Sequence, residues 1–244
     1  MAKFVCIQSG HQNASQNCDV SLRKSSGAPG EAEFTVKTRD RLSQILISKG
    51  IQVQLVDSCF NCDPNADNKD YDLFLALHYD AYINGSIGGF ADFPEPSTDG
   101  ATKESQRITK VINEVYFPES GIQYVNRSNA NTRYYYMWKF LSAKTPCVLL
   151  ECGTGQNPHD KVILQDTERV ATAIARAICK AFNIQFDAPV PPVDPCANVK
   201  KELEIAKKTI IELQAKLEAS SKGWEADKKR LKQINDISKG KEEQ

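Results

Sequence analysis

Two periodicities alternate along the first 187 residues. Short apolar runs predict buried strands, and longer stretches with apolar side chains three or four positions apart predict amphipathic helices. The predicted strands are residues 3–8, 51–56, 72–77, 88–93 and 147–150, and the predicted helices are residues 33–49, 102–116, 134–141 and 161–182. Because strands and helices alternate, the pattern predicts an α/β fold with a mostly parallel twisted sheet and helices on both of its faces.

The pattern changes after residue 187. Residues 188–196 are rich in proline, which disfavours helix and predicts a stiff extended linker. From Val199 to Ile234, apolar side chains recur in alternating steps of four and three, the heptad spacing of a coiled coil, with a polar centre at Ser220 and Asp227. We therefore expect three parts, which are a first domain (1–187), a linker (188–196) and a helical segment (197–244).

The heptad segment is expected to make the protein a homo-oligomer, with the contacts lying in residues 199–234. Two alternatives stay open for it. The segment could be a lone helix packed back on the first domain, or a frayed tail, because isolated helices gain most of their stability from packing.

Charge and composition narrow the classes of partner. The chain has 31 basic and 31 acidic side chains, so it has no overall field that would hold nucleic acid or an anionic membrane surface. Its apolar runs are too short to cross a bilayer, and its first residues lack the apolar stretch of a signal peptide. These features predict a cytoplasmic protein without nucleic-acid binding or membrane insertion.

The eight cysteines are most simply free thiols in a reducing compartment. Cys59 and Cys62 form a CxxC motif, for which a local disulfide or a metal site is the alternative. A four-cysteine zinc site would require a second pair at a suitable spacing, and Cys6 with Cys18 does not provide one.

Polar groups follow three of the predicted strands. His11 comes just after the first strand, His78 directly after the strand 72–77, and Glu151 directly after the strand 147–150. Functional groups gather beyond the carboxyl ends of strands in open α/β sheets. A glycine-rich turn, residues 27–30, leads into Glu31 and the first helix, and adds a further carboxylate at this edge.

Two imidazoles and one carboxylate are the ligand set of a catalytic zinc, and a further carboxylate can act as general base. The simpler interpretation is that each histidine is a hydrogen-bonded loop residue and that the glutamate complements the helix dipole. Glu151 fits that interpretation least, because a carboxylate at the end of an apolar strand costs desolvation unless it is paired.

These motifs resemble a known family. The strings Ser9-Gly10-His11, Leu75-Ala76-Leu77-His78-Tyr79-Asp80 and Val148-Leu149-Leu150-Glu151-Cys152-Gly153, with the turn before Glu31 and the later Asn157-Pro158-His159-Asp160, resemble the zinc-dependent N-acetylmuramoyl-L-alanine amidases of the amidase-3 type. The resemblance covers about residues 3–183. The separate C-terminal segment and the absence of an export signal make the chain similar to the bacteriophage endolysins of that family.

The resemblance implies one Zn²⁺ held by His11, Glu31 and His78, with Glu151 as the catalytic carboxylate. Glu33 is the alternative ligand to Glu31. The substrate implied is bacterial peptidoglycan, cleaved between N-acetylmuramic acid and the L-alanine of the stem peptide, with the enzyme held in the host cytoplasm until lysis. The chain departs from the family pattern at Tyr79, Asp80 and Thr154. These departures affect the expected substrate groove more than the expected metal site.

The segment 127–138 is rich in amide, guanidinium and aromatic groups, which suit a polymer of sugars and peptides. We expect Arg127, Asn129 and Arg133 to contact substrate, while the tyrosines and Trp138 could instead pack against the sheet. His159 is expected to be a surface or capping residue. Two competing functions stay open, which are a zinc exopeptidase acting on free peptides and a non-catalytic oligomeric adaptor.

Overall fold

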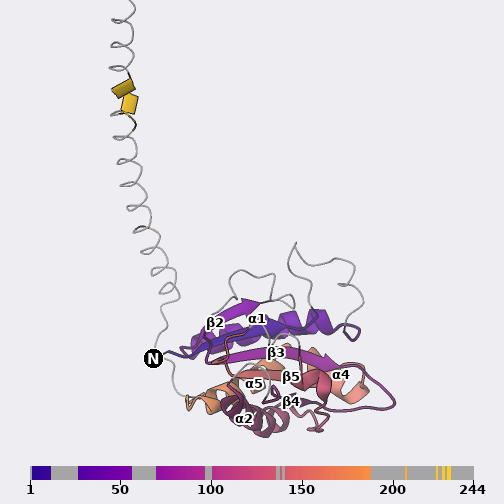
Figure 1. The fold of residues 1–244 in the computed structure, drawn as a ribbon. Helices are drawn as coiled ribbons and strands as arrows, with labels where there is room; N and C mark the ends of the chain where they lie inside the picture. The colour runs from indigo at the N-terminus through magenta and orange to yellow at the C-terminus, as the bar shows by residue number, and fades with distance from the viewer. Residues whose placement is uncertain are drawn as a thin grey trace, which may run out of the picture. The chain divides into compact units, whose positions relative to one another are not determined.

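The computed structural model describes residues 2–11, 27–56, 70–96, 101–135, 138 and 141–187, together with residues 207, 224, 227, 228, 230 and 231. The chain divides into two compact units, residues 1–190 and residues 191–244. All strands and all the helices bounded below lie in the first unit, which Figure 1 shows with its labels.

A five-stranded sheet with the order β2-β1-β3-β5-β4 forms the centre of the first unit. Its strands are β1 (Phe4–Ser9), β2 (Gln52–Val56), β3 (Leu73–Asp80), β4 (Phe90–Asp92) and β5 (Cys147–Thr154). The first four strands in this order are parallel, and β4 is antiparallel to β5 at the edge. The helices are α1 (Glu31–Ser48), α2 (Thr102–Ser120), α3 (Ala130–Arg133), α4 (Pro158–Gln165) and α5 (Thr167–Ala181).

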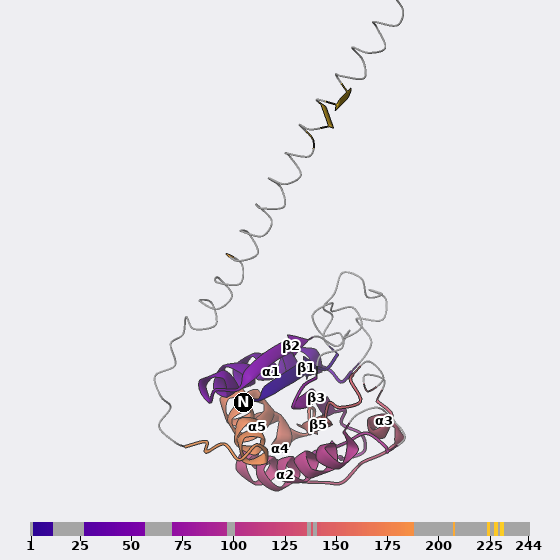
Figure 2. The ribbon, with the colours of Figure 1, turned by 60° about the vertical axis from the view of Figure 1, so that its left-hand side comes forward.

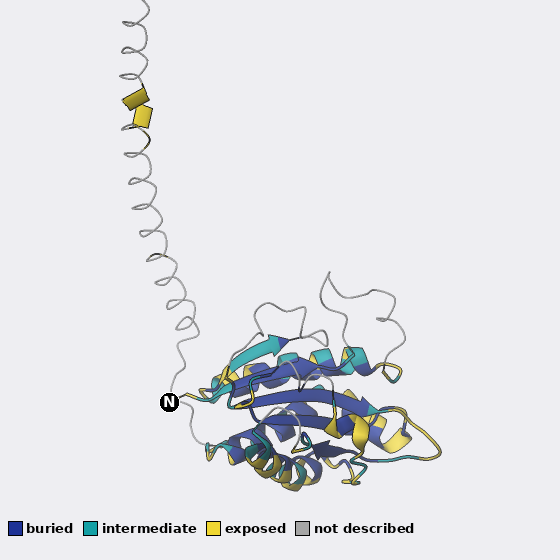
Figure 3. Ribbon diagram, viewed as in Figure 1, coloured by how far each residue is buried: buried dark blue, intermediate teal, exposed yellow. Residues whose placement is uncertain are grey.

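The two faces of the sheet are covered differently. Alternate strand residues, such as Val5, Leu75 and Val148, pack with α1, α2, α4 and α5 in one large apolar cluster. The residues between them on the strands belong to a smaller cluster that contains Trp138 and Leu141. Figure 2 shows α1, α5 and α2 on one side of the sheet and α3 on the other, and Figure 3 shows that the central strands are buried.

The α/β fold and the mostly parallel sheet are therefore confirmed, and each of the five predicted strands is present. Two strands run further than predicted. β3 continues to Asp80 and β5 to Thr154, because the parallel ladder between them continues through His78 and Glu151. His78 and Glu151 thus lie within strands rather than beyond them.

Two helix predictions are corrected. The predicted helix 161–182 is two helices, because Asp166 ends α4 and its side chain accepts the backbone N–H of Arg169 as the cap of α5. The predicted helix 134–141 is misplaced at its start, because the short helix α3 ends at Arg133 and Tyr134 is its C-cap. Residues 136, 137, 139 and 140 lie outside the described residues.

In the second unit, the six described residues are helical. The linker and most of the predicted heptads lie outside the described residues, so the coiled coil stays a prediction. None of the helices in the described part of the chain has the length and apolar character that crossing a bilayer requires. Of the cysteines, Cys6, Cys147, Cys152 and Cys179 are buried free thiols, and Cys18, Cys59, Cys62 and Cys196 lie outside the described residues.

Candidate metal centre and active site

Three side chains from separate parts of the chain meet at the carboxyl ends of β1 and β3. His11 follows β1, Glu31 is the first residue of α1, and His78 lies near the end of β3. Each offers a ligand atom within 4.8 Å of the others. The structure thus brings together the three residues that the sequence predicts as metal ligands.

Glu31 is the centre of this cluster. Its Oε1 atom lies 3.0 Å from Nδ1 of His78 and 3.5 Å from Nε2 of His11, and it accepts the backbone N–H of Tyr79 at 3.1 Å. Its Oε2 atom accepts the N–H of Ala28 at 2.8 Å. The carboxylate is therefore fixed by two backbone donors, one from the glycine-rich turn and one from β3, while it faces both imidazoles.

Glu33, the alternative ligand, does not join the cluster. Its side chain is exposed on α1 and lies 2.6 Å from Nζ of Lys37 one turn later. The spacing of two residues places Glu33 on a different face of the helix from Glu31. The geometry therefore favours Glu31 over Glu33 as the ligand.

Two glycines allow the ligands to approach one another. A Cβ atom at Gly10 would lie 2.4 Å from the ring of His78, and one at Gly27 would lie 2.5 Å from the ring of His11. Gly27 also has a φ of +92°, which disfavours other residues. His11 itself has a φ of 56°, a conformation that is uncommon for residues other than glycine, although histidine adopts it more often than most. The local backbone is thus arranged around the cluster.

The protonation of these groups suits a divalent cation. Burial lowers the pKa of His11, against the opposing charge of Glu31, so this imidazole is neutral at neutral pH. Burial opposes ionisation of Glu31, but the hydrogen bond with His78, and the positive charge of each imidazole when it is protonated, lower its pKa below the usual value. Neutral imidazole and ionised carboxylate are the forms that bind a metal.

Glu151 lies beside the cluster on β5. It is the direct neighbour of His78 across the parallel ladder, and both side chains are on the face of the sheet opposite α1 and α5. Its Oε2 atom is buried and has no hydrogen-bond partner among the described residues. Burial, together with the charges of Asp80 and Glu31, holds the pKa of Glu151 well above its usual value.

A buried carboxylate oxygen without a partner is costly, and it is expected where a ligand or water completes the site. The donor set of two imidazoles and one carboxylate matches that of catalytic zinc sites, which leave a coordination position open. The residues present therefore fit a zinc ion with Glu151 next to it.

The three predicted substrate-binding residues all make contacts within the protein. Arg127 donates from Nε to Asp80 at 3.0 Å and also bonds two backbone carbonyls. Asn129 caps α3, and Arg133 lies 2.7 Å from Glu95. Each of these three side chains therefore has a role in the structure of the protein. Their binding of substrate stays a prediction.

Sequence reasoning missed Tyr135 and Gln8 as members of the site. The hydroxyl of Tyr135 lies 3.2 Å from Nε2 of His78 and donates to Oε1 of Gln8 at 3.1 Å. The alternation of side chains along β1 was the available signal. Gln8 is two residues after Cys6, so both side chains lie on one face of the sheet, and His78 lies on that face too. His159 is largely exposed beside Asp160, as expected of a surface residue.

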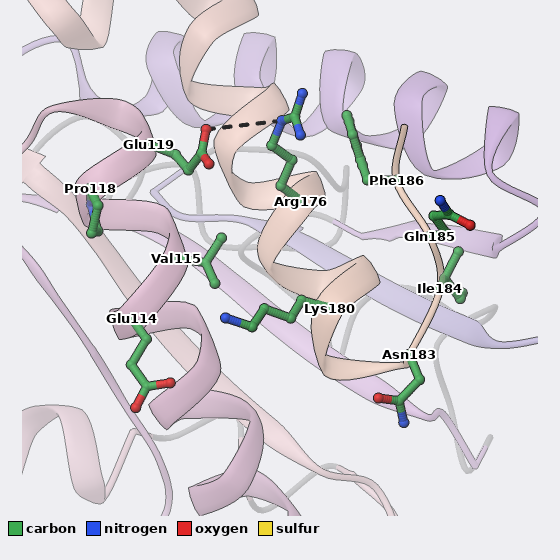
Figure 4. A pocket seen from close by; sticks show the side chains of 10 residues that line it. All are labelled: Glu114, Val115, Pro118, Glu119, Arg176, Lys180, Asn183, Ile184, Gln185 and Phe186. Carbon is green, nitrogen blue, oxygen red and sulfur yellow. Dashed lines mark ion pairs between the residues drawn. The ribbon is translucent and has the colours of Figure 1, made fainter. Parts of the chain in front are cut away.

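Two cavities differ in their relation to the cluster. One of about 420 Å³ is lined by Gly30, which precedes Glu31, and by Tyr79, which follows His78. Another, of about 610 Å³, lies between α2, α5 and the segment that follows α5, and Figure 4 shows Glu119 and Arg176 facing each other in it. None of the candidate metal or catalytic residues lines this second cavity, so it is separate from the site.

Comparisons with known proteins agree with this arrangement. The curated relatives include a probable cell wall amidase, LytH, from Staphylococcus aureus, which is 24% identical over 188 residues, or 76% of this chain. The match spans only 59% of the length of that relative.

Similar solved structures include the N-acetylmuramyl-L-alanine amidase Ami1 from Mycobacterium smegmatis, with a TM-score of 0.58 at 18% identity over 75% of this chain and 98% of that one. The amidase AmiC2 of Nostoc punctiforme has a TM-score of 0.54 at 18% identity, over 74% and 97% of the two chains. The catalytic domain of the CD27L endolysin has a TM-score of 0.50 at 17% identity, over 73% and 97%.

The relatives and structures above are too distant in sequence to assign the family, but a family model assigns it. The model described as N-acetylmuramoyl-L-alanine amidase (Amidase_3) matches residues 5–182, which include β1 from its second residue, the other four strands and the whole His-Glu-His cluster. Since this match covers most of the chain, the protein belongs to the Amidase_3 family of N-acetylmuramoyl-L-alanine amidases.

Proposed function

We propose that this chain is a zinc-dependent hydrolase of bacterial peptidoglycan. The bond cleaved is the amide between the lactyl group of N-acetylmuramic acid and the L-alanine of the stem peptide. One observation carries the proposal, which is the cluster of His11, Glu31 and His78 with the unpartnered carboxylate of Glu151 beside it, in a chain of this family.

His11, Glu31 and His78 would hold the ion. When bound there, Zn²⁺ supplies a Lewis acid that polarises a carbonyl and lowers the pKa of water. Glu151 accepts the proton of the attacking water and passes it to the departing amine of L-alanine. Burial raises the pKa of Glu151, which favours its holding the proton between the two steps.

The alternatives have less support. An exopeptidase with two metals would require further ligands, and His11, Glu31 and His78 form the one three-residue group suited to a metal in the described part of the chain. A non-catalytic adaptor would have no need of a buried carboxylate beside that group. The endolysin role, with the enzyme held in the host cytoplasm until lysis, is part of the proposal, and the similar fold of the CD27L endolysin's catalytic domain is compatible with it.

The test combines metal content with product analysis on purified peptidoglycan. We expect about one zinc per chain and release of new N-terminal alanine without new reducing sugar ends. Glu151→Gln should lower kcat by about 10²- to 10⁴-fold while zinc content stays near one, because the change removes the proton acceptor and keeps the shape.

Glu33→Gln, an exposed carboxylate on α1, is the matched control and should retain full activity. His78→Ala should lose both zinc and activity. Full activity of Glu151→Gln would refute the assigned mechanism, and a wild-type protein that binds no metal and releases nothing from any cell wall would refute the proposed function.

A further inference from the structure

Tyr135 connects a predicted metal ligand to the first strand of the sheet. Its hydroxyl lies 3.2 Å from Nε2 of His78, and the two rings meet edge to face with centroids 5.5 Å apart. On its other side, the ring of Tyr135 packs against Trp138 at 5.3 Å. Trp138 is fully buried and donates to the backbone carbonyl of Thr132, so Tyr135 is supported by the core.

The hydrogen bond to Gln8 orients the hydroxyl of Tyr135. Gln8 is fully buried, and its Oε1 atom accepts the proton of Tyr135 at 3.1 Å. A phenol has one proton to donate. Because that proton is directed at Gln8, the oxygen of Tyr135 is left to accept a hydrogen bond, and the N–H at Nε2 of His78 is the donor that faces it.

Tyr135 therefore favours the proton of His78 on Nε2, whereas the carboxylate of Glu31 favours it on Nδ1 when no metal is bound. With the proton on Nε2, the lone pair of Nδ1 points toward Oε1 of Glu31, which is 3.0 Å away. An unprotonated nitrogen and a carboxylate oxygen repel each other at this distance unless a cation binds both. The tautomer that Tyr135 favours is therefore the one in which His78 and Glu31 can share a metal ion.

We propose that Tyr135 is a positioning residue for His78, and that its hydroxyl, oriented by Gln8, stabilises the Nε2–H tautomer and the ring angle that metal binding requires. This inference rests on the proposed zinc-dependent function. Ligating histidines commonly donate their second ring N–H to a neighbouring group, and loss of that group weakens metal binding by about 10- to 100-fold.

Tyr135→Phe tests the hydroxyl alone, because the ring contacts with His78 and Trp138 are kept. The first measurement is zinc affinity, by competition with a chromophoric chelator, and we expect the variant to bind about 10- to 100-fold more weakly than the wild type. Tyr134→Phe is the matched control, since Tyr134 is exposed and its hydroxyl is no part of the chain from Gln8 to His78. It should bind zinc as tightly as the wild type.

The second measurement is the tautomer itself, from ring ¹⁵N chemical shifts of His78 in the metal-free protein at a pH where the ring is neutral. Glu31 favours the proton on Nδ1 and Tyr135 favours it on Nε2, so the wild type should show more of the Nε2–H form than Tyr135→Phe does. Gln8→Met gives an independent variant. Without its acceptor, the hydroxyl of Tyr135 is free to donate to Nε2, so the shifts should move toward the Nδ1–H form and zinc affinity should fall.

Unchanged zinc affinity and unchanged His78 shifts in both variants would overturn the inference. So would an equal loss of affinity in Tyr134→Phe, which would indicate a general effect of the segment. Failure of the proposed function is recognised separately, because it would appear in the wild type as absence of zinc binding and of amide hydrolysis.

Discussion

At the scale of single residues, the charges around Glu151 decide how it ionises. Asp80 lies two residues after His78 on β3, and its charge adds to burial in raising the pKa of Glu151, whereas the charge of Arg127 lowers it. Arg127 also pairs directly with Asp80. The charge of Arg127 therefore offsets part of the rise in the pKa of Glu151 that burial and the charges of Asp80 and Glu31 cause.

Arg127→Met should shift the acidic limb of the pH profile of kcat/KM to higher pH. Removing the guanidinium leaves the charge of Asp80 unopposed and raises the pKa of Glu151 further. Since activity requires ionised Glu151, it is present above that pKa and is lost as the pH falls through it, and a higher pKa moves the loss to a higher pH.

Arg127→Lys keeps the positive charge but not the planar fork, so its acidic limb should stay closer to that of the wild type. Steady-state kinetics on soluble muropeptides from pH 5 to 9 would measure both variants. A raised KM with an unmoved limb would instead support the predicted contact between Arg127 and substrate.

The predicted ligands could be found from the sequence because each lies near the end of a strand or after a glycine-rich turn and matches a family motif. In the structure, the helix start separates Glu31 from Glu33, and the hydrogen bond from the backbone N–H of Glu31 to the carbonyl of Ala28 fixes that start. Tyr135 could not be found in this way. Its contact with His78 joins residues 57 positions apart, and no local pattern encodes such a pairing.

At the scale of elements, the edge strand β4 depends on one side chain of α2. Asn113 accepts the backbone N–H of Ala91 at 2.7 Å and donates to the carbonyl of Ala91 at 3.2 Å. β4 pairs with β5 on its other side, so Asn113 satisfies groups that a neighbouring strand would otherwise bond. It thereby fixes α2 against the edge next to Glu151 and protects that edge from pairing with another chain.

Asn113→Leu should lower the free energy of unfolding by about 2 kcal/mol, because a donor and an acceptor of β4 lose their partners while a similar volume is kept. Urea unfolding followed by circular dichroism would measure the change. The neighbouring Glu114→Ala is the control, since Glu114 is exposed and only 3.8 Å from Lys110 in a surface pair, and it should change stability by less than about 0.5 kcal/mol. Equal effects of the two substitutions would contradict the assigned role of Asn113.

Element boundaries were harder to predict than element types. The apolar spacing of residues 161–182 continues across Asp166, because α4 and α5 both bury residues in the cluster on the same face of the sheet. The break is a capping event at Asp166, which hydrophobic periodicity does not register. Likewise, β3 was predicted to end before His78 on grounds of polarity, but the ladder with β5 carries it to Asp80.

At the scale of the whole molecule, the second unit presents apolar groups that lack burial. Trp224 and Leu231 are seven residues apart on the predicted heptad seam, so they lie on one face of a helix. Their relative exposures are 65% and 66%. Large apolar side chains at heptad spacing gain stability by packing against a second helix, so the homo-oligomer through residues 199–234 stays our prediction.

A chain that ends at Asp187 should be a monomer that keeps zinc and hydrolyses soluble muropeptides at the rate of the full-length protein, because every predicted site residue precedes Asp187. The full-length protein should be an oligomer in light scattering after size-exclusion chromatography.

Leu231→Glu in the full chain should weaken that association without altering soluble-substrate kinetics, since it places like charges along the seam. If the oligomer serves to multiply weak wall contacts, both changes should slow lysis of intact cells more than hydrolysis of small fragments. An identical oligomeric state with and without residues 188–244 would show that the apolar seam has a different partner.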